Sequence, residues 1–132
     1  MAVVHNILRQ YKTPSGAAIQ LAEAPSGNAE SNLNDSAPIA ANHQYFRTYT
    51  RSKLLSLCIS ASDAITIYTN NPSGSSPQDT IAIPVAPGQT LIWTLAADGL
   101  SKCPFSADVT TVYVTNATAA AVPFSISALL AV

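Results

Sequence analysis

Apolar and polar residues alternate with a period of two through most of this chain, and each alternating stretch ends in turn-forming residues. A period of two places successive side chains on opposite faces of a strand, whereas a helix requires a period of about 3.6. The tripeptide Pro-Ser-Gly occurs three times. It favours a turn because proline presets φ and glycine accepts the positive φ of a type II turn. We therefore expect an all-β chain with little or no helix.

The spacing of these stretches predicts roughly nine short strands in one domain, 1–132, and this pattern is typical of an antiparallel β-sandwich, jelly-roll-like in type. We expect the strands at 3–12, 17–24, 44–51, 53–60, 64–70, 81–85, 91–95, 108–116 and 122–128. Residues 25–44 are the most polar and turn-rich part and are expected to form a long polar loop. Pro84 and Pro123 indicate strand edges, ends or bulges, since proline cannot donate to the ladder.

Composition limits the classes of function. Apolar residues make up 48% of the chain, which excludes disorder, and only 10% of residues are charged, too few for the exposed faces of a helical bundle. The net charge of -1 excludes a dedicated duplex-DNA binder, so we expect no nucleic-acid partner. Charged residues interrupt the first twenty positions, which excludes a signal peptide there, and the apolar C-terminal segment is too short to span a bilayer. We expect no membrane partner.

Groups suited to catalysis or metal binding are scarce. The two histidines, His5 and His43, stand far apart in the sequence, and no Gly-x-Ser-x-Gly motif is present. Cys58 and Cys103 are interpreted as buried thiols, although a bridge between two strands stays open. Acidic residues between positions 23 and 36 could ligate calcium, but a solvated polar segment is the favoured interpretation. We expect a protein that is not an enzyme, with no catalytic residue, no metal and no cofactor.

One strand carries an unusual face. Aromatic and basic side chains alternate along it at Tyr45, Arg47, Tyr49 and Arg51. Tyrosine and arginine are enriched in protein–protein hot spots, and aromatic residues can also stack on sugars or on single-stranded bases. A plain solvent-facing strand is the other interpretation. We take these four residues as the candidate protein interface.

The end of the chain is uncharged, because no charged residue follows Asp108. Soluble proteins commonly place charges on edge strands to prevent pairing with other chains. A neutral final strand therefore predicts that its edge is covered, either by the rest of the fold or by another subunit. We favour assembly.

Several phrases in the second half of the chain resemble small virion proteins of tailed bacteriophages. They are Ile65-Thr66-Ile67-Tyr68-Thr69-Asn70, Asp79-Thr80-Ile81, Pro87-Gly88-Gln89, Leu91-Ile92-Trp93 and the run from Pro104 to Ala117. The resemblance covers roughly residues 50–132 and brings no catalytic motif. It implies a β-sandwich that attaches to a capsid or tail as a decoration, cement or fibre-base subunit.

The resemblance, the scarce catalytic groups and the low charge lead to one hypothesis. The chain is expected to be a non-enzymatic structural virion protein, most simply a capsid decoration or cement subunit that stabilises a phage head. Its partners would be the major capsid protein or another virion protein, and further copies of itself in a closed homo-oligomer such as a trimer. Residues 1–12 are the candidate for a strand exchanged with a neighbour. The alternative is a tail or fibre protein that binds carbohydrate, with Tyr45, Tyr49 or Trp93 stacking on sugars.

Overall fold

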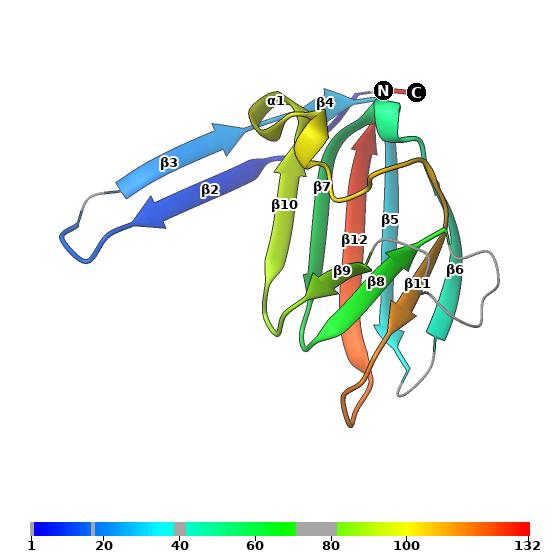
Figure 1. Ribbon diagram of the computed structural model, residues 1–132. Coiled ribbons are helices and arrows are strands. Elements are labelled where there is room, and N and C mark those ends of the chain that lie inside the picture. Colours follow the sequence, from blue (N-terminus) through cyan, green and yellow to red (C-terminus); the bar gives the residue numbers. More distant parts are fainter. Residues whose placement is uncertain (1, 17, 39–41, 71–81) are drawn as a thin grey trace.

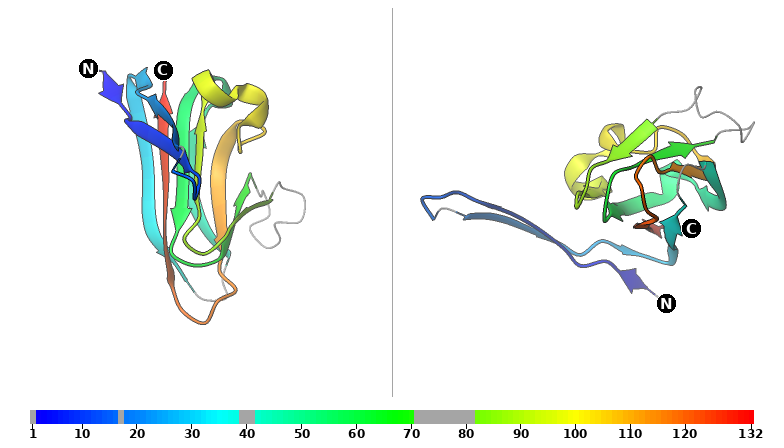
Figure 2. Two further views of the ribbon diagram at one scale, coloured as in Figure 1. Left: turned by 90° about the vertical axis from the view of Figure 1, so that its left-hand side faces the viewer. Right: turned by 90° about the horizontal axis from the view of Figure 1, so that it is seen from below.

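The computed structural model describes residues 2–16, 18–38, 42–70 and 82–132. Two four-stranded antiparallel sheets pack face to face, and a two-stranded hairpin projects from one end of this sandwich (Figures 1 and 2). The first sheet has the strand order β10-β7-β12-β5, with bounds Thr90–Thr94, Leu54–Ala61, Val122–Leu130 and Ala29–Ala37. The second has the order β6-β11-β8-β9, with bounds Asn42–Tyr49, Val109–Thr115, Ile65–Thr69 and Ala82–Val85. The short strands β1 and β4 pair beside them, at Val3–Val4 and Ser26–Gly27.

The sandwich has the topology of a jelly roll. Counted along the chain from β5, its eight strands lie in the order 1-8-3-6 in the first sheet and 2-7-4-5 in the second. The jelly roll is an eight-stranded double sheet built in this way from two Greek keys. The predicted all-β, antiparallel, jelly-roll-like sandwich is confirmed. In the described residues, helix is limited to α1, Leu95–Asp98, and two 3₁₀ turns at Arg51–Lys53 and Leu100–Lys102.

The core lies between the two sheets and is filled by the side chains that the alternation predicted to point inward. They include Ile65, Ile67, Val112, Val114, Phe124 and Ile126. In strand β7 the alternation predicts one shared face for Leu55, Leu57 and Ile59, but Leu54 is buried in place of Leu55. The pairing of β7 with β12 shifts by one residue near this end, and a one-residue shift moves a side chain to the other face of the sheet.

The prediction of a polar loop over residues 25–44 is wrong. Strand β5 occupies nine of these positions and pairs with β12 along its whole length. Only Leu33 and Ala37 are buried, whereas most of the other side chains are exposed on the outer face or at the edge of the sheet. The polar composition thus reflects a strand with one solvent-exposed face, which antiparallel sheets allow. This strand, β4 and the division of residues 3–12 into two strands raise the number in the described chain to twelve.

The neutral final strand is covered by its own fold. Strand β12 lies between β7 and β5 and pairs with both, so its lack of charge needs no second subunit. Assembly has to be argued from another surface. The two prolines lie where they were predicted, Pro84 on the edge strand β9 and Pro123 near the start of β12.

Candidate interaction surface

Among the described elements, the most exposed is the hairpin of β2, Ile7–Lys12, and β3, Ala18–Glu23, which we call the arm. Its strands pair over six residues, and the turn between them contains Gly16 at φ 90°. The Gly16 amide donates to the Thr13 carbonyl at 3.0 Å. The hairpin around Pro14-Ser15-Gly16 is therefore the one that the turn signal predicted. Beyond its root, the arm extends away from the sandwich (Figures 1 and 2).

The two faces of the arm differ in chemistry. Cross-strand partners share a face, and the pairs Tyr11–Ile19 and Arg9–Leu21 place three apolar side chains together. Tyr11 is 65% exposed, Ile19 71% and Leu21 44%. The opposite face carries Leu8 and the cross-strand pair of Gln10 and Gln20. An isolated two-stranded hairpin is at best marginally stable in water, and an apolar patch on a soluble protein commonly marks a contact site.

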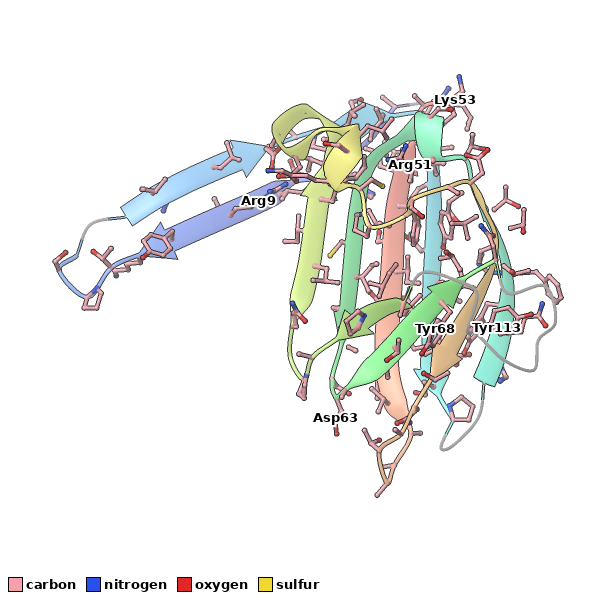
Figure 3. All side chains as sticks on the ribbon, viewed as in Figure 1. Arg9, Arg51, Lys53, Asp63, Tyr68 and Tyr113 are labelled. Carbon is pink, nitrogen blue, oxygen red and sulfur yellow. The ribbon has the colours of Figure 1, made fainter. Side chains whose placement is uncertain are left out.

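Arg9 holds the end of the arm nearest the sandwich, which we call its root, at the point where α1 follows β10 (Figure 3). Its guanidinium donates to both carboxylate oxygens of Asp98, at 2.9 and 2.7 Å, and to the Thr94 hydroxyl at 3.1 Å. The same hydroxyl donates to Glu23 at 2.6 Å, which ties β3 to the same point. The hydrogen bond from Arg9 lowers the pKa of Asp98 below its usual value. A two-point contact of this kind fixes direction as well as distance.

A second anchor lies at the start of the arm. His5 contacts the Ser56 hydroxyl through Nδ1 at 3.0 Å and the Glu30 carboxylate through Nε2 at 3.1 Å. Its backbone amide donates to the Pro25 carbonyl, beside the short β1–β4 pair. Strand β4 also approaches β12 closely, since a Cβ at Gly27 would stand 2.4 Å from the Leu130 carbonyl oxygen. The segment before the arm is thus held on the first sheet.

Between this segment and the outer face of the first sheet lies a groove of about 620 Å³. The sheet contributes small or apolar side chains to it, at Ser56, Cys58, Ile92 and Ser127. Apart from His5 and Glu30, its lining is uncharged. Across the described residues, no group of three or more histidine, cysteine, aspartate or glutamate side chains could hold a metal ion.

The candidate interface at Tyr45, Arg47, Tyr49 and Arg51 is wrong in its main feature, because this face of β6 points toward the core. Tyr49 is fully buried, and Tyr45 packs on Phe124 at 5.7 Å between ring centroids. The exposed face is the opposite one, with Phe46 73% exposed. Period two identifies two faces but not which of them is buried, and here both carried aromatic residues.

The two arginines of that set have separate roles. Arg51 lies in a 3₁₀ turn after β6, and its guanidinium donates to the carbonyls of Phe105 and Leu100 at 2.7 and 2.8 Å. Its backbone amide donates to Asp108 at 2.8 Å. Arg51 therefore holds the segment before β11 in place. Arg47 is half-buried and donates to the carbonyl of Phe46 at 3.0 Å.

Of the three side chains expected to stack on sugars, Tyr49 and Trp93 are buried and Tyr45 is half-buried. Trp93 is 2% exposed, and its indole N–H donates to the Gly99 carbonyl at 2.8 Å. The Tyr45 hydroxyl donates to Asp35 at 2.8 Å. Cys58 and Cys103 are free thiols, and burial raises the pKa of both. Cys103 is buried as expected, whereas Cys58 is half-buried on the outer face of the sheet.

Comparison with known proteins identifies no family for this chain. No family model matches the chain, and no curated protein does. A de novo designed double-stranded β-helix is similar with a TM-score of 0.40 and 11% identity, covering 76% of this chain and 99% of that one. A chain from Bacillus endospore appendages, described as a novel family of disulfide-linked pili, has a TM-score of 0.44 and 15% identity, covering 78% and 87%. Neither likeness carries an argument about function. In the described part of the chain, no helix has the length and apolar character to cross a membrane.

Proposed function

We propose that this protein is a non-enzymatic structural subunit of a phage particle, most simply a decoration or cement protein of the head, and that the arm is its contact with neighbouring protein. The projecting arm with its apolar face is the observation that carries the proposal. Three large apolar side chains held in water by a two-stranded ribbon are unfavourable unless another protein covers them. The resemblance of the second half of the chain to small virion proteins supports the choice of a phage particle.

The way in which the arm is fastened supports the same role. The paired contacts of Arg9 and His5 with the sandwich orient the root of the arm, so less freedom is lost when the distal half is covered. A weak contact per subunit is sufficient for a protein present in many copies, since linked contacts strengthen one another.

The test uses particles from a phage in which the gene for this chain is disrupted. Purified protein is added back, and its binding is measured by co-sedimentation. Truncating the apolar face of the arm with Tyr11→Ser, Ile19→Ser and Leu21→Ser is expected to weaken binding by about 100-fold or more. The matched control changes the opposite face with Gln10→Ser and Gln20→Ser, and it should bind as the unaltered protein does. Equal binding by both variants, or the absence of the protein from purified wild-type particles, would overturn the proposal.

A further inference from the structure

We infer that the free edge of β10 is the receptor for the arm of a second copy of this chain, whose β2 strand adds to it. The first sheet then has the order β3-β2-β10-β7-β12-β5, with its first two strands supplied by the neighbour. This inference rests on the proposed function, because it names the partner that the arm contacts.

The four edge strands of the sandwich differ in how they are protected. Soluble proteins guard exposed edges with charges, prolines or bulges. Strand β5 carries Glu30 and Asp35, β6 carries Arg47 and β9 carries Pro84. Strand β10, with the sequence Thr-Leu-Ile-Trp-Thr, has none of these devices. Within the described residues no other strand pairs with its outer side, so it is the edge best suited to accept a strand.

The backbone of β10 offers hydrogen-bonding groups on that side. The Thr94 amide donates to Asp98 at 2.9 Å, so it points away from β7. Residues of an antiparallel strand alternate between groups directed at the partner and groups directed away from it. Ile92 and Thr90 therefore direct their N–H and C=O groups toward the open edge. Strand addition from another chain uses such groups for affinity.

The arm provides what this edge lacks. Strand β2 has six residues against the five of β10, and its outer side pairs with no other strand in the described chain. An antiparallel addition places the tip of the arm beside the end of β10 that carries Thr90. Asp63 lies in the turn at that end of the sheet (Figure 3), where its exposed carboxylate has no ion pair among the described residues. Lys12, at the tip end of β2, is likewise exposed and has the complementary charge.

The first part of the test blocks the open edge of β10 without altering the β10–β7 ladder. Ile92→Pro removes one outward-directed N–H, and proline is tolerated on an edge strand in that position. The matched control, Ile92→Ala, loses more apolar bulk than the proline variant does but keeps the N–H. Multi-angle light scattering from about 1 to about 100 µM should show an oligomer for the unaltered chain and for the control. The Ile92→Pro variant should be monomeric and should retain the circular dichroism spectrum of the unaltered protein.

The second part of the test is complementation between two monomeric variants. One copy has a blocked edge and an intact arm (Ile92→Pro), and the other has an intact edge and a truncated arm (Tyr11→Ser, Ile19→Ser, Leu21→Ser). Each alone should be monomeric, and an equimolar mixture should form a heterodimer. A mixture that stays monomeric would overturn the inference. So would an unaltered chain that is monomeric throughout, or an Ile92→Pro variant that assembles as the unaltered chain does.

These outcomes separate the inference from the proposed function. If the chain is monomeric and its arm variant still loses binding to particles, the arm contacts a different virion protein, and only the inference fails. If complementation succeeds but purified particles lack the protein, the pairing of arm and edge stands and the proposed function fails.

Discussion

The fastening of the arm by Arg9 can be tested with the single change Arg9→Met, which keeps a long side chain and removes the charge. Three hydrogen bonds of Arg9 are lost, two to Asp98 and one to Thr94. Bonds to charged groups contribute about 1.5–3 kcal/mol each. The side chains of Arg9 and Asp98 are 27% and 21% exposed, which lowers the value toward the roughly 0–1 kcal/mol of a surface pair. We expect about 2 kcal/mol in total, or about 30-fold in the equilibrium for opening the arm.

Native-state hydrogen exchange measures this opening residue by residue. Protection of the amides in β2 and β3 should fall about 30-fold, and protection in the central strands β11 and β12 should not change, because the arm lies outside the core. The control is Arg47→Met, because the Arg47 guanidinium donates to no described residue other than the neighbouring Phe46 carbonyl; this change should leave the arm unaffected. Unchanged protection of the arm, or an equal loss in β11 and β12, would refute the view that Arg9 acts locally on the arm.

Three further outcomes follow from the contacts described. Gly27→Ala should destabilise the fold by about 1–3 kcal/mol in urea denaturation, because its Cβ would meet the Leu130 carbonyl oxygen at 2.4 Å; Ser26→Ala on the same strand is the control, and equal stabilities would contradict this. Asn116→Ala should cost about 2 kcal/mol, since this buried amide donates to two carbonyls and accepts from a backbone amide; an unchanged midpoint would show that these bonds contribute nothing. The pKa of Asp98 is lowered in the folded protein. The ion pair with Arg9 therefore stabilises the closed arm fully above the ordinary carboxyl pKa of about 4, and this stabilisation is lost as the pH falls through and below that value. The protection factors of the arm amides, which are corrected for the intrinsic pH dependence of exchange, should fall over that range, and unchanged protection factors would exclude the ion pair as the anchor.

The sequence was sufficient for the fold class and for most of the core. Alternation placed Ile65, Ile67, Val112 and Val114 inward, because a strand buried on one face must separate its apolar residues by two. The loop predicted from composition was wrong at β5, because an exposed edge strand can have the same polar composition as a loop. Such a strand is recognised only once β12 is seen to pair with it along nine residues.

The candidate site could be predicted only in part. The turn at Pro14-Ser15-Gly16 predicted the hairpin, and residues 1–12 were already the candidate for an exchanged strand. Nothing in the sequence distinguished the exposed Tyr11 from the buried Tyr49, since both lie on alternating strands beside basic residues. Exposure depends on which segments pack on a strand, and that is a property of the topology. The open edge of β10 could not be predicted from the sequence either, because a strand is an edge strand only when no other strand pairs with one of its sides.

The central claim is that the arm joins this protein to its assembly, and electron cryomicroscopy of the assembled particle tests it most directly. We expect Tyr11, Ile19 and Leu21 to be buried against a neighbouring protein, with the arm as ordered as the sandwich. A map in which the sandwich is attached through another surface, while these three side chains stay in solvent, would contradict it.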